Sequence, residues 1–382
     1  MHTNYTKLTQ ILVKILFIAT LFYAVISLYK IITTGAPDFS VFFLSAVNLI
    51  HRKNLYLDQT LFTGLGYPPV TLIPFLPFTL LPYRMAQGLW VAGSFIMFGA
   101  SIIISLRLVN KLNSQAFMLA FILGFLSFPT RFTLGMGQVN FYALVLFLAS
   151  LYLAKERKIL AAVLLTAAIT VKPHFVFLLP FFIPAGEGAI MVWGLISYLG
   201  LMFITGMIFG WFQLTTYLTT LPPLLVFHGR EIYYNQGISG FFARVLPGVS
   251  ARPGTLVASV SIVTLSLIIA YRKRLSLDKS LTLALPMLLL VEPLSWQHHD
   301  VFLIPVFIYL TKIYWGNRGK LGILAVSYLL ISINLKTPSV WSNMPLGGLI
   351  LSHGFLATVL LYILGLITVA EMPHEPGLPT GG

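Results

Sequence analysis

Apolar stretches of helix length recur along almost the whole chain, and they constrain its fold more than any other feature. The first begins near Ile11 and continues for about 20 residues, which is long enough to cross a bilayer as a helix. Hydrophobic residues make up 58% of the chain, charged residues only 9%, and the mean hydropathy is +0.90. The apolar runs are continuous and do not alternate with polar residues as barrel strands do. The sequence therefore predicts an all-α, polytopic membrane protein.

Basic residues at the ends of the apolar runs predict the topology. We expect twelve spans, with both termini and the basic clusters at 155–158 and 272–274 on the cytoplasmic side. The expected spans are 11–32, 85–106, 115–129, 140–154, 159–171, 175–184, 189–211, 254–271, 281–296, 301–314, 321–335 and 346–370. Residues 1–370 then form one membrane domain with external loops at 33–83 and 212–253, and the proline- and glycine-rich tail 371–382 is expected to be disordered.

The first external loop is itself apolar. Residues 39–50 suit a helix that lies on the membrane surface and ends at the basic residues 51–53. Residues 67–82 contain five prolines, which disfavour a regular spanning helix. We expect this second segment to be juxtamembrane or half-inserted, on the same side as Asp38.

The net charge of +14 comes from 24 basic and 10 acidic residues. Because the basic residues lie mostly in short loops between spans, they indicate topology and contact with anionic lipid headgroups, and no nucleic-acid partner is expected. The chain has no cysteine, which excludes disulfides, thiolate metal sites and cysteine nucleophiles.

Isolated polar residues gather on the predicted external side, in five separate loops. They include Asp38, Tyr67, Arg131, Gln138, Asn140, Lys172, His174, Asn235, Gln236, Arg244, Trp296, His298 and His299. Single cations at span ends can be snorkelling side chains, but five converging loops favour a site for an anionic ligand such as a lipid phosphate.

Asp38, the His298–His299 pair and Lys172 are interpreted separately. Asp38 can cap the following helix or act as a general base on a hydroxyl. His298 and His299 can suggest a metal site, but adjacent histidines on a helix diverge and no ligand cluster completes one, so phosphate contact is the better functional hypothesis. Lys172 has no acidic residue close in sequence, which predicts the lipid phosphate as its partner.

Six motifs in order resemble glycosyltransferase family 87, a group of membrane glycosyltransferases with the GT-C fold that includes polyprenol-phosphate-mannose-dependent α-mannosyltransferases. The motifs are Pro37-Asp38-Phe39, Tyr67-Pro68-Pro69, Gly137-Gln138-Val139-Asn140, Lys172-Pro173, Asn235-Gln236 with the following Arg244, and Ser295-Trp296-Gln297-His298-His299. The resemblance implies that Asp38 is the catalytic aspartate and that Lys172 with His298 or His299 lies near the donor phosphate. Many GT-C enzymes have a second, metal-binding acid in a loop; Gln138 and Asn140 occupy that region here, so no metal or other cofactor is expected.

The resulting hypothesis is an inverting sugar transfer at the outer face of the plasma membrane, by a monomer. The donor is a sugar, mannose or another hexose or pentose, on a polyprenyl phosphate, and the acceptor is a lipid-linked or cell-envelope glycan. Asp38 is the expected base. The expected donor-phosphate ligands are Lys172, His298, His299, Arg131 and Arg244, and the expected substrate contacts are Tyr67, Gln138, Asn140, His174, Asn235, Gln236 and Trp296. The alternative is a transporter or flippase of a lipid-linked sugar, which uses the same cationic cavity without a base.

Overall fold

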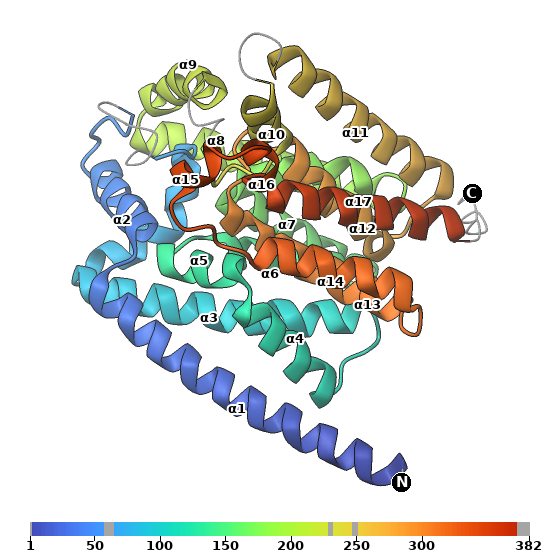
Figure 1. Ribbon diagram of the computed structural model, residues 1–382. Coiled ribbons are helices and arrows are strands. Elements are labelled where there is room, and N and C mark those ends of the chain that lie inside the picture. Colours follow the sequence, from blue (N-terminus) through green and yellow to red (C-terminus); the bar gives the residue numbers. More distant parts are fainter. Residues whose placement is uncertain (1, 57–64, 228–231, 247–250, 373–382) are drawn as a thin grey trace.

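The computed structural model describes residues 2–56, 65–227, 232–246 and 251–372 (Figure 1). Within these ranges the chain forms helices and no β-strand, and an isolated β-bridge joins Asn235 to Trp296. The helices are α1 (His2–Thr34), α2 (Pro37–Ile50), η1 (Pro69–Leu80), α3 (Tyr83–Leu108), α4 (Ser114–Leu126), α5 (Phe128–Met136), α6 (Asn140–Leu153), α7 (Lys158–Val171), η2 (Pro173–Phe182), α8 (Gly188–Phe209), α9 (Trp211–Phe227), α10 (Ile238–Val245), α11 (Ala251–Lys273), α12 (Leu277–Val291), η3 (Gln297–Leu303), α13 (Ile304–Ile313), α14 (Arg318–Ser332), α15 (Pro338–Ser342), α16 (Gly347–Ile350) and α17 (His353–Glu371). The η segments are 3-10 helices.

Five helices in the described residues are long and apolar enough to cross a membrane. They are Lys7–Thr34 of α1, α3, α8, Arg252–Lys273 of α11, and α17, and the pair α4–α5 adds a sixth if it is one span bent by 68°. Twelve spans are expected from the sequence because that number also includes shorter segments such as α6 and α7. These two have 14 residues each. A helix of that length rises about 21 Å, less than the roughly 30 Å of a hydrocarbon core. The all-α, polytopic class is confirmed, with five helices of spanning length, or six with the bent pair, among the described residues, against the twelve spans expected.

Charged contacts gather at one end of the bundle, here called the basic end. Lys158 at the start of α7 lies 3.2 Å from Glu187 before α8. Lys320 in α14 lies 2.7 Å from Glu371 at the end of α17, and Lys273 contacts the same helix end. In Figure 1, α1 begins and α17 ends toward this side of the molecule, at the right of the view. Both ends of the described chain therefore lie with most of the basic clusters, as the topology predicts.

The chain reverses direction at Lys172. Helix α7 begins at the basic end, and Glu187, which follows η2, lies back beside Lys158 at the same end. Segments α7 and η2 therefore run in opposite directions with a single residue between them. Pro173 favours this break because the residue before a proline is disfavoured in the helical region; Lys172 has φ −137° and ψ 89°. The two segments expected at 159–171 and 175–184 are therefore present as α7 and η2.

The proline-rich segment leaves and returns at the same end of the bundle. Tyr67 Oη lies 2.8 Å from Lys172 Nζ, and Thr71 Oγ1 donates to the Thr170 carbonyl at 2.8 Å. After η1, Arg84 donates to the carbonyl of Thr33 at 3.1 Å, close to the end of α1. Tyr67 and Pro82 consequently lie at one end, as the prolines predict.

Aromatic side chains fix α2 against its neighbours. Its buried face follows helical spacing and comprises Phe39, Phe42, Phe43, Ala46 and Leu49. The Phe42 and Phe75 rings stack at 4.7 Å, and Phe75 lies 4.4 Å from the ring of Trp90 in α3. The expected surface helix is therefore present, but one face of it is packed into the protein core.

The expected external loop 212–253 contains much of α9 and the whole of α10. The following helix, α11, begins at Ala251, three residues before the expected position 254. Most of the expected tail, residues 373–382, lies outside the described residues.

Candidate active site

Four chain junctions meet opposite the basic end: α1–α2, α5–α6, α7–η2 and α12–η3. Hydrogen bonds between their side chains join Gln138 to Asp38 and Lys172 to His299. Asp38 and Lys172, which are 134 positions apart, thus lie at the same end, as expected. We call this group of residues the Asp38 cluster, with Tyr67, Asn140, His174, Glu292 and His298 as its other members.

Asp38 is the second residue of α2 and not its cap. Ala36 occupies the N-cap position, and the helix begins with Pro37. The Asp38 carboxylate accepts a hydrogen bond from Gln138 Nε2 across the α5–α6 turn. Burial raises the pKa of Asp38 to about 6, although the Gln138 hydrogen bond and the charge of Lys172 oppose that rise. This is the environment of a carboxylate that can take up a proton near neutral pH.

The α5–α6 turn holds Gln138 in place. Gly137 ends α5 with φ +70°, a left-handed conformation that glycine adopts without strain. Its carbonyl accepts a hydrogen bond from Trp90 Nε1 at 2.9 Å. On either side of the turn, Thr133 Oγ1 in α5 and Asn140 Nδ2 in α6 both donate to the carbonyl of His298, at 2.8 and 2.9 Å. The turn therefore connects the aspartate to the histidine loop.

Lys172 is completely buried, and its ammonium group has two side-chain partners among the described residues. Tyr67 Oη and His299 Nε2 each lie 2.8 Å from Nζ. A lysine ammonium has three donors and no acceptor, so both partners accept from it. One N–H of the ammonium is left for another ligand.

Glu292, at the end of α12, is the residue of this cluster that sequence reasoning missed. Its side chain is 1% exposed; Oε2 lies 3.0 Å from His299 Nδ1, and Oε1 contacts His174 Nδ1. Lys172 has no acidic residue close in sequence, but the fold brings one close in space: Glu292 lies one imidazole ring away. The available signal was the scarcity of acids, since only ten occur in the chain and this one lies three positions before Ser295, where the histidine motif begins.

The two adjacent histidines have different surroundings. Both ring nitrogens of His299 are engaged, by Lys172 and Glu292. His298 is 5% exposed and neither of its ring nitrogens has a hydrogen-bond partner within the described ranges. Its ring packs edge-on against Phe132 at 5.2 Å and parallel to Trp296 at 6.3 Å. A buried histidine with two free nitrogens is available to a substrate.

Other expected site residues build the support behind the histidine loop. Gln236 Oε1 accepts from the backbone N–H groups of Gly354 and Phe355 at 3.0 and 3.1 Å, and so caps α17. Its own N–H donates to the Ser295 carbonyl at 2.6 Å, and the adjacent Asn235 pairs with Trp296 in the β-bridge.

The two expected arginines do not contact the Asp38 cluster. Arg244 donates to Ser352 Oγ at 3.0 Å and to the carbonyls of Ile232 and Asn235 at 3.0 and 2.8 Å. Arg131 is exposed on the surface of α5. As placed here, Arg244 braces the loop at 232–235, and Arg131 is free to meet solvent or lipid headgroups.

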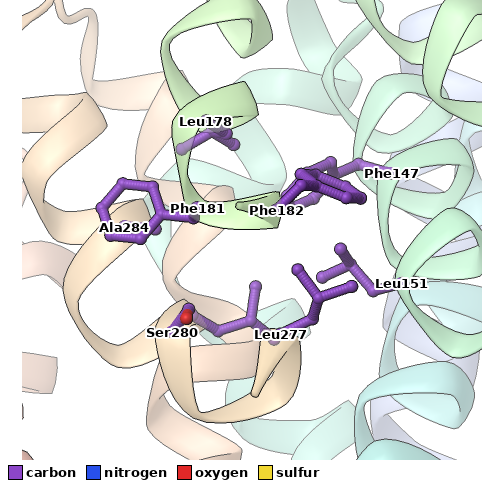
Figure 2. A pocket seen from close by; sticks show the side chains of 9 residues that line it. Phe147, Leu151, Leu178, Phe181, Phe182, Leu277, Ser280 and Ala284 are labelled. Atoms are coloured by element: carbon purple, nitrogen blue, oxygen red, sulfur yellow. The ribbon is translucent and has the colours of Figure 1, made fainter. Parts of the chain in front are cut away.

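Figure 2 shows a separate, small pocket between α6, η2 and α12. Apolar side chains such as Phe147, Phe182 and Leu277 line it, together with Ser280. These positions lie on the halves of their helices that point toward the basic end, away from Glu292. No titratable residue lines this pocket, so the candidate active site remains the Asp38 cluster. Within the ranges described, no group of three histidine, aspartate or glutamate residues is arranged to hold a metal ion.

Sequence comparisons identify the family of the chain. The profile of glycosyltransferase family 87 matches residues 62–293, more than half of the chain. A polyprenol-phosphate-mannose-dependent alpha-(1-2)-phosphatidylinositol pentamannoside mannosyltransferase from Mycobacterium tuberculosis (strain CDC 1551 / Oshkosh) is 26% identical over 330 residues, covering 80% of this chain and 74% of the relative. A protein of the same name from Mycolicibacterium smegmatis (strain ATCC 700084 / mc(2)155) is 30% identical over 311 residues, covering 75% of this chain and 73% of the relative.

The profile match includes Lys172 and Glu292, whereas Asp38 and the histidine pair lie outside it. With a match of this extent over an all-α, polytopic membrane fold, the chain belongs to glycosyltransferase family 87 and is a membrane glycosyltransferase of the GT-C type.

Proposed function

We propose that this glycosyltransferase moves a sugar from a polyprenyl-phosphate donor to a hydroxyl group of a lipid-linked or cell-envelope glycan, with inversion at the anomeric carbon. The observation that carries the proposal is the presence of a half-buried carboxylate, Asp38, and a fully buried ammonium, Lys172, at the same end of the bundle, close enough for the charge of Lys172 to act on Asp38. The names of both relatives specify polyprenol-phosphate-mannose and a phosphatidylinositol mannoside, which makes mannose the first sugar to test.

The proposed reaction is a single displacement. Asp38 takes the proton of the acceptor hydroxyl as its oxygen attacks the anomeric carbon. The bond from that carbon to the phosphate oxygen breaks on the opposite face, and the electron pair leaves with the phosphate. Lys172 donates its remaining N–H to the phosphate, whose charge grows as the sugar departs. Gln138 holds the Asp38 carboxylate in place throughout.

His298 is the histidine we assign to the donor. His299 already uses both ring nitrogens within the protein, while those of His298 are free among the described residues. A buried imidazole without partners is costly unless a ligand supplies them. The donor phosphate, adjacent to Lys172, is the ligand we propose.

The Asp38 cluster is proposed to face the exterior of the plasma membrane. Helix junctions at the basic end carry the runs 155–158 and 272–274, and short loops rich in lysine and arginine remain cytoplasmic. The Asp38 cluster lies at the opposite end. A donor and an acceptor on membrane lipids can reach it there without crossing the bilayer.

The test is transfer by the purified full-length protein in vesicles, with polyprenyl-phosphate mannose as donor and a panel of glycolipid acceptors. Asp38→Asn is expected to reduce transfer about 10²- to 10⁴-fold, the usual contribution of a general base. Asp278→Asn, the same change in the first turn of α12 at the basic end, is the matched control. Normal transfer by Asp38→Asn contradicts the mechanism, and donor lipid translocation without transfer in the wild type supports a transporter instead.

A further inference from the structure

Glu292 is buried behind the proposed phosphate site and has no place in the reaction as written above. We propose that it is a positioning residue for the transfer: it fixes His299 in one tautomer and orientation, and His299 in turn holds the Lys172 ammonium for the donor phosphate. The inference rests on the proposed function, because Lys172 must act on a leaving phosphate for its orientation to matter.

The hydrogen bonds define the tautomer of His299. The Lys172 ammonium can only donate, so His299 Nε2, at 2.8 Å, accepts and carries no proton. The proton of the neutral ring is then on Nδ1, which lies 3.0 Å from Glu292 Oε2, and a carboxylate accepts it. The hydrogen bond from Lys172 to His299 therefore depends on the one from His299 to Glu292, because only a ring that is protonated at Nδ1 can accept at Nε2. Without the acceptor at position 292, the other tautomer places an N–H against the ammonium.

The carboxylate of Glu292 is itself held at both oxygens. Oε1 contacts His174 Nδ1 in η2 while Oε2 contacts His299 in η3, and the side chain is 1% exposed. It therefore cannot rotate to follow a moving imidazole. His174 comes two residues after Lys172, so the contacts close a ring that joins the α7–η2 junction to the α12–η3 loop.

Charge gives the same residue a second effect on Lys172. A buried ammonium is costly to desolvate unless a counter-charge is near. Asp38 can lose its charge when it takes the acceptor proton, whereas Glu292 takes part in no proton transfer. Glu292 consequently supplies a constant negative charge behind Lys172 during the reaction.

The experiment compares Glu292→Gln with Glu187→Gln in vesicles of the full-length protein, using polyprenyl-phosphate mannose. Glu187 is a buried glutamate paired with Lys158 at the basic end, and it controls for the loss of a buried carboxylate. Glu292→Gln is expected to lower kcat about 10- to 100-fold, as loss of an outer-shell partner does at other sites, with a smaller change in donor KM. Glu187→Gln is expected to retain wild-type kcat.

A double-mutant cycle separates positioning from a general effect on structure. In a Lys172→Ala background, Glu292→Gln is expected to cause no further loss of kcat, because the group that it positions is absent. Equal losses in the two backgrounds overturn the proposal, as does wild-type kcat for Glu292→Gln. If Glu292→Gln does not fold, His299→Gln interrupts the same series and must show the same loss; unchanged kcat then overturns it.

The experiments distinguish a failure of the proposed function from a failure of the positioning role of Glu292. Normal transfer by Asp38→Asn refutes the mechanism whatever Glu292 does. Loss of transfer in Asp38→Asn, together with wild-type kinetics in Glu292→Gln, refutes only the positioning role.

Discussion

Gly137→Ala is a substitution whose effect the structure specifies closely. Gly137 has a φ of +70°, and a Cβ atom there would lie 2.8 Å from the Cβ atoms of both Ala36 and Phe39. These two residues flank the Pro37-Asp38 pair at the start of α2, and their Cβ atoms cannot move without the backbone. The added methyl group therefore has to push the α5–α6 turn away from α2.

Two energetic costs add at this position. A left-handed conformation costs a residue with a Cβ atom about 1–2 kcal/mol, and an extra methyl group in a packed core costs about 1–3 kcal/mol. We expect the free energy of unfolding to fall by about 2–5 kcal/mol in total. The displacement also separates Gln138 from Asp38. Turnover is expected to fall about 10- to 100-fold, because misplacing a catalytic group by about 1 Å can cost a factor of about 10².

The assay measures the thermal unfolding of the purified protein, and its transfer rate at a temperature where the variant remains folded. Gly135→Ala is the matched control: Gly135 also lies in α5, and no atom lies within 4 Å of the added Cβ. Alanine in a helix is favoured over glycine by about 0.5–1 kcal/mol, so this control is expected to be slightly stabilised. Wild-type stability and turnover for Gly137→Ala would refute the close approach of the turn to α2.

Three further measurements test the site and the topology. Lys172→Ala is expected to weaken donor binding and to slow transfer together. Lys172→Arg is expected to rescue both in part, because the positive charge returns without the geometry of the ammonium group. Unchanged donor affinity and turnover in Lys172→Ala would contradict the proposed contact between this lysine and the donor phosphate. Asp38 is a base only when ionised and its pKa is about 6, so kcat/KM is expected to be full above that pH and to fall about tenfold per pH unit below it; a flat profile down to about pH 4 argues against this base. The chain lacks cysteine, so a single cysteine at Pro82 should be labelled from outside and one at Lys155 only from inside, and the reverse pattern inverts the topology.

Much of the architecture can be read from the sequence because apolar length and proline position are local signals. They predict the helical class, the surface helix after Asp38, the break at Lys172 and the return of the segment 67–82. The length of each helix is harder to predict. An apolar run such as 140–154 has the composition of a span, and nothing local shows that its helix has only 14 residues.

The site could be predicted only in part, because its partners are distant in sequence. The pairing of Asp38 with Gln138 spans 100 positions, and Lys172 meets His299 across 127. The order of the motifs predicts that these residues lie at one end of the bundle, but it does not predict which of them are in contact. Residue type does not distinguish His298, with its free nitrogens, from His299, which is fully engaged. Nor does it show that Gln236 is used to cap α17.

The distance between Lys172 and its partners has a consequence for biogenesis. At a synthesis rate of about 5–20 residues per second, the lysine leaves the ribosome about 6–25 s before His299, which follows it by 127 positions. Helix α7 and segment η2 therefore reach the membrane before the glutamate that counterbalances the lysine exists. Until α12 inserts, Lys172 has to remain near water or phospholipid headgroups, and its burial is a late event in assembly. The arrival of α12 and η3 thus supplies both the counter-charge of Glu292 and the histidines of the proposed phosphate site.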